Sequence, residues 1–271
     1  MDYTDKVVVI TGAAGGLGLA LAEQFLAAGA QVALLDVNGD AVRSAAERLR
    51  TAAPGRVFAR ACDVTSATDC EHAIASVLAC WGGVDVLVNN AGIAHRSLFG
   101  DTDNAVLRRV MDVNFFGAVH CTHAALPSLR ARRGQIVAIS SVAGFSPLFG
   151  RTGYSASKHA LHGFFDSLRS ELEHDGVAVT IVCPAFIATG IERAALGADG
   201  GPATLPRNAV GHEMPPAVMA ARILAAVRHR PRLYLPTPLA RIAWWTSRLA
   251  PAFFARQMKR RAAPPSPTPN H

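Results

Sequence analysis

The chain predicts one α/β domain, and three observations support this fold class. Half of its 271 residues are hydrophobic, so the chain can bury a large core. Apolar runs of strand length alternate with longer helical stretches along the chain, which is the pattern of α/β domains. A glycine-rich turn follows the first apolar run. A chain of this length leaves no room for a second catalytic domain.

Seven strands are expected, with helices between them. They are residues 6–11, 31–36, 56–62, 84–89, 135–141, 177–183 and 232–235. The two longest helical stretches lie near 103–130 and 152–174, before and after the strand 135–141. We expect these two helices to flank that strand.

The first turn has the sequence of a phosphate-binding loop. The strand 6–11 is followed at once by Gly12-Ala13-Ala14-Gly15-Gly16-Leu17-Gly18, and Leu17, Leu21 and Phe25 share one stripe of the next helix. Glycines here allow a tight turn and let backbone N–H groups approach a pyrophosphate at the helix N-terminus. The preceding strand and following helix supply the context that a dinucleotide site requires.

An acidic residue ends the second expected strand. Asp36 lies 24 positions after Gly12, close to the offset of ~20 residues for a carboxylate that binds an adenosine ribose. A carboxylate accepts hydrogen bonds from the ribose hydroxyls and repels a 2′-phosphate, and no Arg or Lys occurs between Lys6 and Arg43. The sequence therefore favours NAD over NADP. The alternative is that Asp36 caps the helix that starts near Gly39.

Tyr154 and Lys158 stand four residues apart in a chain with only three tyrosines and three lysines. On a helix, positions i and i+4 share one face, so an ammonium can lie beside the phenol. A nearby positive charge lowers a tyrosine pKa from its reference value of ~10, which would make Tyr154 a general acid/base. The alternative is an exposed helix pair without a catalytic role.

The strand 135–141 ends in two hydroxyl residues, Ser140 and Ser141, and Ser141 lies 13 residues before Tyr154. A strand end, a short loop and a helix start can bring Ser141 and Tyr154 to one site. There the Ser141 hydroxyl would hold a substrate oxygen while Tyr154 transfers a proton. No Gly-x-Ser-x-Gly elbow surrounds either serine, so we do not expect a nucleophile.

Together these motifs resemble the short-chain dehydrogenase/reductase family over roughly residues 5–190. The matching segments are Thr-Gly-x-x-x-Gly-x-Gly at 11–18, Asn89-Asn90-Ala91-Gly92, and Ser141 with Tyr154-x-x-x-Lys158. The resemblance implies a doubly wound parallel sheet of the Rossmann type, a nicotinamide cofactor, and a homodimer or homotetramer formed through the two long helices. It also implies that Lys158 binds the nicotinamide ribose and that Asn114 holds a proton-relay water. The implied catalytic set is Asn114, Ser141, Tyr154 and Lys158.

The expected cofactor contacts come from the glycine turn and from the resemblance. The resemblance implies that Asp63 and Val64 contact the adenine and that Pro184 and Thr189 meet the nicotinamide carboxamide. Ala185 stands where the family usually has Gly, which would stiffen that loop. The full expected set is Gly12, Ala14, Gly16, Leu17, Gly18, Asp36, Asp63, Val64, Asn90, Ala91, Gly92, Tyr154, Lys158, Pro184 and Thr189.

The segments that border the expected site are apolar. No Arg or Lys that could pair with a substrate carboxylate or phosphate is evident among the bordering residues, so we expect a hydrophobic substrate; these residues are Val142, Phe145, Leu148, Phe149, Phe186 and Ile187. The stretch of about 188–216 carries Gly and Pro and is expected to be a lid that excludes water. The expected substrate contacts are Ser141, His95, Phe145, Phe149, Phe186 and Ile187.

These residues predict an NAD-dependent enzyme that interconverts a hydrophobic secondary alcohol and its ketone. Steroid-, terpenoid- and retinoid-like alcohols and aromatic or long-chain alcohols all fit. Ser141 would hold the alcohol oxygen, Tyr154 would accept its proton as a phenolate, and the carbinol hydride would pass to the nicotinamide. The alternative is a protein of the same fold that binds NAD(H) for sensing or scaffolding, without turnover.

The net charge of +7 lies at the C-terminal end. Residues 214–271 contain 10 Lys or Arg and no Asp or Glu, whereas residues 1–213 carry a net charge of −3. Cations and large apolar residues mix within residues 238–261, which is typical of an amphipathic segment at an interface. Three roles stay open for this extension: docking on the enzyme's own surface or a second subunit, a lid over an apolar pocket, and peripheral membrane contact.

The remaining composition bounds the partners and the domains. No groove-reading motif accompanies the basic residues, so nucleic acid is not expected. The five Cys and ten His have no metal-ligand spacing, and an odd Cys count without a secretory signal favours a cytoplasmic protein. We expect the dinucleotide-binding and catalytic domain at 1–237, the basic helical extension at 238–261, and a proline-rich, disordered tail at 262–271.

Overall fold

The computed structural model describes residues 1–206 and 213–262, with side chains up to residue 258. Within these residues lies one parallel sheet of seven strands, in the order β3-β2-β1-β4-β5-β6-β7. The strands are Val7–Thr11 (β1), Gln31–Asp36 (β2), Val57–Ala61 (β3), Val86–Asn89 (β4), Gln135–Ile139 (β5), Ala178–Val182 (β6) and Leu233–Tyr234 (β7). Each lies inside a strand that the sequence predicts, so the strand assignments and the α/β class are confirmed.

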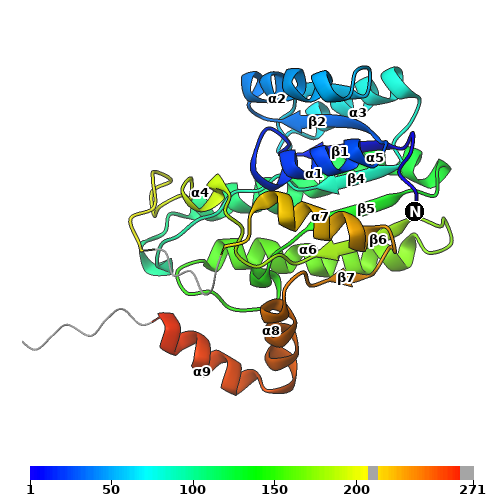
Figure 1. Ribbon diagram of the computed structural model, residues 1–271. Coiled ribbons are helices and arrows are strands. Elements are labelled where there is room, and N and C mark those ends of the chain that lie inside the picture. Colours follow the sequence, from blue (N-terminus) through cyan, green and yellow to red (C-terminus); the bar gives the residue numbers. More distant parts are fainter. Residues whose placement is uncertain (207–212, 263–271) are drawn as a thin grey trace, which may run out of the picture.

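Helices cover both faces of the sheet, as the doubly wound prediction requires (Figure 1). Helices α1 (Gly16–Ala27), α2 (Gly39–Ala52) and α7 (Pro216–Val227) pack on one face, and α3 (Ala67–Trp81), α5 (Gly117–Ala131) and α6 (Thr152–Glu171) on the other. Strands buried on both faces explain why the sequence shows continuous apolar runs rather than alternation. The strand order reverses between β1 and β4, where doubly wound folds bind ligands at the carboxyl ends of the strands.

The first of the two predicted long helices is interrupted. Helix α4 (Asn104–Met111) passes through a π-helical turn (Asp112–Phe116) before α5 begins. Such a turn inserts one residue into the helical register, and π-turns are frequent at functional sites. The inserted register turns Asn114 inward, where it is 1% exposed. The second long helix, α6, is continuous over 20 residues.

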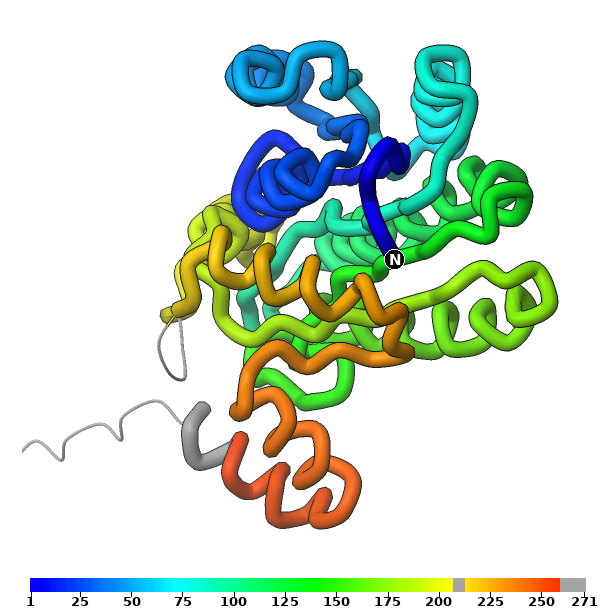
Figure 2. Tube along the Cα trace, turned by 45° about the vertical axis from the view of Figure 1, so that its right-hand side comes forward, coloured from blue at the N-terminus to red at the C-terminus, as the bar shows by residue number. Residues whose placement is uncertain are grey.

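The C-terminal extension is helical and forms a hairpin outside the doubly wound layers. Helices α8 (Pro238–Leu249) and α9 (Pro251–Ala262) meet at Ala250, because Pro251 cannot continue the helix of α8. In the views of Figures 1 and 2 the hairpin lies below the sheet, beyond β7. Among the described residues, no helix has the length and apolar character needed to cross a bilayer.

Two sequence predictions fall partly or wholly outside the described residues. The structure does not describe residues 207–212 of the predicted lid at 188–216. It also does not describe nearly all of the predicted disordered tail at 262–271. Short 3-10 helices occupy Phe99–Asp101, Val142–Gly144 and Gly190–Glu192, and the last of these lies inside the predicted lid segment.

Candidate active site

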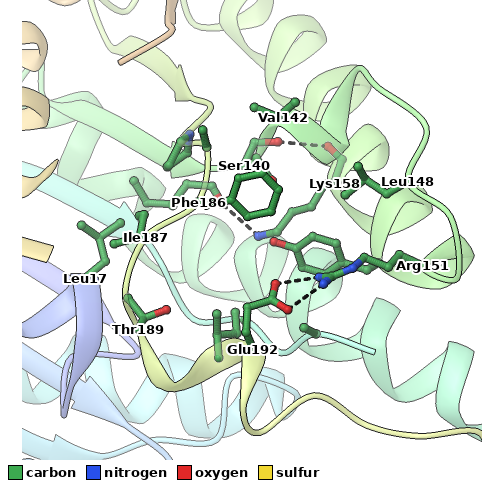
Figure 3. A pocket seen from close by; sticks show the side chains of 18 of the residues that line it. Leu17, Ser140, Val142, Leu148, Arg151, Lys158, Phe186, Ile187, Thr189 and Glu192 are labelled. Atoms are coloured by element: carbon green, nitrogen blue, oxygen red, sulfur yellow. Dashed lines mark hydrogen bonds and ion pairs between the residues drawn. The ribbon is translucent and has the colours of Figure 1, made fainter. Parts of the chain in front are cut away.

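A cavity of about 630 Å³ opens at the carboxyl ends of β1, β2, β4, β5 and β6. Its wall has three parts: the glycine turn with the ends of β2 and β4, the hydroxyl-bearing end of β5 with α6, and the α8–α9 hairpin. Figure 3 shows the central part, with Lys158, Phe186 and Glu192 projecting into the same space. The cavity thus joins the predicted cofactor residues, the predicted catalytic residues and the C-terminal extension in one site.

The glycine turn has the shape that a dinucleotide requires. Gly12 and Gly16 both have left-handed backbone conformations, with φ of 62° and 56°. A Cβ on Gly12 would lie 2.9 Å from Ala91 Cα, and one on Gly18 would lie 2.1 Å from the Gly12 carbonyl oxygen. Gly18 therefore lets α1 pack against its own turn, while Gly15 faces open space on its Cβ side. These features fit a pyrophosphate held by backbone N–H groups.

Asp36 lines the cavity at the end of β2. Its carboxylate accepts hydrogen bonds from the backbone N–H groups of Ala14 and Asn38, each at 3.0 Å. The alternative that Asp36 caps the next helix is wrong, because the Asn38 side chain is the N-cap of α2 and accepts from Ala41 N at 3.0 Å. Asp36 thereby holds the glycine turn and is also part of the cavity wall.

Most of the other predicted cofactor residues belong to the same wall. Leu17, Asn90, Ala91, Gly92, Pro184 and Thr189 line the cavity together with Tyr154 and Lys158. Asn90 fixes the β4 end against the glycine turn, since its side-chain amide donates to the carbonyl oxygens of Thr11 and Gly12 at 3.0 Å. Ala14, Gly18, Asp63 and Val64 are not part of the cavity wall. Asp63 is exposed, and its carboxylate accepts a hydrogen bond from Thr65 N, whereas Val64 is buried.

Tyr154 and Lys158 lie on α6 with their side chains in the cavity. The Lys158 Nζ atom is 5.8 Å from the centroid of the Tyr154 ring and donates to the Ile139 carbonyl oxygen at 2.9 Å. Burial raises the pKa of Tyr154, and a hydrogen bond with Ser141 lowers it. Burial also lowers the pKa of Lys158 to about 8, which weakens the ammonium as a charge. The expected lowering of the Tyr154 pKa by Lys158 is therefore not seen in this structure, because desolvation is the larger effect.

Ser141 and Asn114 differ in their relation to the cavity, because Asn114 is buried and is not part of the cavity wall. Ser141 lines the cavity, and its hydroxyl accepts from Ala143 N at 3.1 Å. The Asn114 side chain donates to the Ile93 carbonyl oxygen at 3.0 Å and to Ser157 Oγ at 2.9 Å, and it accepts from Ile93 N at 2.8 Å. Asn114 therefore ties the loop after β4 to α6, beside the cavity.

Three of the predicted substrate contacts lie elsewhere. His95 is fully buried outside the cavity wall, where its Nδ1 accepts from Tyr154 N at 3.3 Å. Phe145 packs against Trp244 with ring centroids 4.9 Å apart, and Phe149 is 52% exposed; neither lines the cavity. Sequence proximity to Ser141 does not decide which way a loop side chain points. Phe186 and Ile187 do line the cavity, as Figure 3 shows.

A buried ion pair beside Tyr154 was not predicted from the sequence. Arg151 and Glu192 form two hydrogen bonds of 2.6 Å, and Arg96 approaches the same carboxylate at 3.4 Å. Arg151 and Glu192 both line the cavity (Figure 3), and their side chains are 7% and 12% exposed. Arg151 stands just before α6, with a non-helical backbone, so helix spacing does not indicate it. Glu192 lies on a different loop, which only the tertiary structure brings to α6.

A second group of side chains that was not predicted lies beside the end of β5. His162 Nε2 is 3.1 Å from Ser140 Oγ and 3.4 Å from Cys183 Sγ, and its ring stacks on Trp244 of α8. Ser140 Oγ in turn donates to the Lys158 carbonyl oxygen at 3.3 Å. Burial lowers the pKa of His162 to about 4, so the imidazole is neutral at neutral pH. The group connects the C-terminal extension to the backbone of α6.

Comparisons with known proteins agree with this geometry. The family model for short chain dehydrogenase matches residues 6–198. The chain is 40% identical over 265 residues to dehydrogenase/reductase SDR family member 7B of Bos taurus, covering 95% of this chain and 82% of the relative. It is 39% identical over 189 residues to 11-beta-hydroxysteroid dehydrogenase-like 2 of Arabidopsis thaliana, covering 69% of this chain and 61% of the relative.

A solved structure extends the similarity over nearly the whole chain. The crystal structure of a short chain dehydrogenase/reductase from Burkholderia phymatum in complex with NAD has a TM-score of 0.83 and 26% sequence identity, and the match covers 99% of both chains. The sheet order, the glycine turn and the tyrosine–lysine pair on α6 are thus accompanied by a family-model match over most of the chain. The chain belongs to the short-chain dehydrogenase/reductase family of oxidoreductases.

Proposed function

We propose that this protein is an NAD-dependent dehydrogenase or ketoreductase that interconverts a hydrophobic secondary alcohol and its ketone. The observation that carries the proposal is the composition of the cavity. Ser141, Tyr154 and Lys158 lie between the end that the glycine turn lines and an apolar end. The apolar end includes Val142, Leu148, Phe186 and Ile187 from loops, and α8 and α9 add further apolar side chains. The Arabidopsis relative carries a hydroxysteroid dehydrogenase name, which supports an apolar alcohol.

In the proposed reaction, Ser141 and Tyr154 act on the substrate oxygen. The Ser141 hydroxyl donates to that oxygen and orients it, and the Tyr154 phenolate accepts the alcohol proton during oxidation. The bound nicotinamide supplies hydride transfer. Lys158 donates a hydrogen bond to the Ile139 carbonyl oxygen beside the site, and Asn114 fixes the loop of Ile93 against α6. In the direction of reduction, the neutral Tyr154 phenol donates the same proton.

Asp36 supports NAD rather than NADP as the cofactor. Asp36 lines the cavity at the end of β2, where a 2′-phosphate would meet its negative charge. The nearest following cation in the sequence, Arg43, is paired with Asp40. The related structure from Burkholderia phymatum was determined with NAD, in agreement with this choice. The expected homo-oligomer through α4–α5 and α6 stays a prediction.

The test is formation of NADH at alkaline pH from a panel of hydrophobic secondary alcohols, with NAD and NADP in parallel. We expect turnover with preference for NAD, and a loss of about 10²- to 10⁴-fold in kcat for Tyr154→Phe, since general acid–base catalysis contributes about that much. Tyr234→Phe is the matched control, because Tyr234 lies on β7 outside the cavity wall. Tight NADH binding without turnover of any alcohol would favour the sensing or scaffolding alternative.

A further inference from the structure

The α8–α9 hairpin concentrates exposed apolar side chains. Among the described residues, eleven large hydrophobic side chains are exposed, and five of them lie on this hairpin. Trp245 is 60% exposed and Leu249 is 77% exposed. Covering these two side chains would remove much apolar surface from water, which is favourable. The other six are spread over five separate segments of the domain. We call the hairpin group the apolar patch; it consists of Leu239, Ile242, Trp245, Leu249 and Phe253.

The apolar patch borders the mouth of the catalytic cavity. Leu239, Ile242 and Phe253 are exposed and also line the cavity. Phe254 and Met258 of α9 continue the lining without being fully exposed. Apolar side chains of the hairpin therefore lie both on its exposed outside and in the wall of the cavity that holds Tyr154. Water-exposed apolar surface at a cavity mouth marks an interaction site rather than an ordinary surface.

The charge of the hairpin restricts what can cover the patch. Arg241, Arg248 and Arg256 are exposed on α8 and α9, and residues 214–271 contain no Asp or Glu. A second copy of the hairpin would bring like charges together, which disfavours self-association through this face. An occupant with negative charge outside and an apolar interior satisfies both the cations and the patch. An anionic phospholipid surface has this composition.

We propose that the α8–α9 hairpin docks the enzyme on an anionic phospholipid surface, with the apolar patch in the acyl–headgroup boundary and the cavity mouth facing the lipid. The hairpin lies on the membrane and does not cross it, since neither helix is long and apolar enough to span a bilayer. Where the proposed dehydrogenase function holds, an apolar alcohol dissolved in the membrane reaches Tyr154 along the patch without passing through water.

The first test measures vesicle binding alone, so it does not depend on the proposed reaction. The full chain is sedimented with phosphatidylcholine vesicles that contain 0 or 40 mol% phosphatidylglycerol. We expect binding that needs the anionic lipid and that falls in 1 M salt, where the Debye length is only about 3 Å. The double variant Trp245→Ser/Leu249→Ser should bind at least about tenfold more weakly, because both side chains lose their apolar surface.

Two matched controls accompany this variant. Val37→Ser/Phe99→Ser removes two apolar side chains of similar exposure (71% and 65%) from other parts of the domain and should bind vesicles like the unaltered chain. Trp245 and Leu249 do not line the cavity, so their double variant should keep its turnover of a water-soluble secondary alcohol. Arg241→Gln/Arg256→Gln should bind anionic vesicles more weakly with the patch intact.

Three results would overturn the docking proposal. The first is no co-sedimentation with anionic vesicles, and the second is equal vesicle binding by the Trp245/Leu249 variant and the unaltered chain. The third is a smaller oligomer of that variant in solution with unchanged vesicle binding, which would assign the patch to a contact with a second copy of the chain. A separate arm compares oxidation of a membrane-dissolved alcohol with and without anionic vesicles. Docking without acceleration there would overturn delivery from the lipid, and docking without any dehydrogenase activity would count against the proposed function alone.

Discussion

At the scale of single residues, Tyr154 is the group whose chemistry depends most on its neighbours. Burial raises its pKa, the hydrogen bond with Ser141 lowers it, and the nearby pair Glu192 and Arg151 acts in opposite directions. The negative charge of Glu192 raises the Tyr154 pKa, and the positive charge of Arg151 lowers it. Substitution of either residue of this pair should therefore shift the pH dependence of the reaction. The sign of the charge that is removed determines the direction of the shift.

Glu192→Gln should shift the alkaline rise of oxidation to lower pH. Oxidation needs the phenolate, and removal of the negative charge lowers the Tyr154 pKa, so the phenolate forms at lower pH. Arg151→Gln should shift the rise to higher pH for the opposite reason. The measurement is kcat/KM for oxidation against pH, with thermal unfolding of each variant as a check, because breaking a buried pair costs about 3–5 kcal/mol. Shifts of equal sign in both variants would show that the pair acts only on the fold.

At the scale of elements, α8 is held to the domain by an aromatic contact with α6 and the segment after β5. Trp244 packs against Phe145 and stacks on His162, and the Arg248 guanidinium lies 3.1 Å from the centre of the Trp244 ring. His162 also hydrogen-bonds at the ends of β5 and β6 through Ser140 and Cys183. In this structure the extension therefore packs on the enzyme's own surface, one of the three roles left open by the sequence.

His162 should make stability depend on acid pH. Burial lowers its pKa from 6.5 to about 4, while Asp166 raises it and His159, Arg248 and Lys158 lower it. The unfolded chain then binds more protons between these values, so the stabilisation is complete above pH 6.5 and is lost as the pH falls through about 4. The loss is at most about 3.5 kcal/mol, since one pKa unit corresponds to about 1.4 kcal/mol.

The measurement is the free energy of urea unfolding between pH 4 and 8, together with NMR titration of His162. His162→Gln should flatten the curve in this range relative to the unaltered chain. Trp244→Ala should raise the His162 pKa toward 6.5, because it removes the ring that covers the imidazole. An unchanged His162 titration in Trp244→Ala would show that α8 does not desolvate the imidazole.

At the scale of the whole molecule, the cavity combines a cofactor end made by the doubly wound domain with an apolar end partly made by the extension. Removal of residues 238–271 should therefore act on one end and spare the other. We expect the KM of a hydrophobic alcohol to rise about tenfold or more, because Leu239, Ile242 and Phe254 leave the wall, and the Kd of NADH to change by less than about threefold. Removal of residues 263–271 alone keeps both helices and is the control.

The role of the extension is decided by comparing the change in the KM of the alcohol with the change in the Kd of NADH. An equal loss of NADH binding and alcohol binding would show that the extension supports the whole domain rather than the substrate end. No change in either would remove α8 and α9 from the substrate site. A raised KM with intact NADH binding fits both the wall observed in the structure and the lid interpretation of the sequence.

The sequence alone was sufficient for everything that depends on local pattern. The inner strands were predictable because strands buried on both faces are nearly continuous apolar runs, whereas the edge strands β3 and β7 are only partly buried. Gly12, Gly16 and Asp36 were predictable because the glycine turn and the next strand end stand at fixed distances along the chain. Tyr154 and Lys158 share a cavity because a helix brings positions four residues apart to one face.

The tertiary structure alone decided what depends on contacts between distant segments. It paired Arg151 with Glu192, 41 residues apart, and moved His95, Phe145 and Phe149 out of the predicted substrate wall. It reversed the expected pKa shift of Tyr154, because desolvation depends on every element that covers the ring. It also brought α8 and α9 to the cavity mouth, since amphipathic composition indicates that a helix face will be covered but not by which surface.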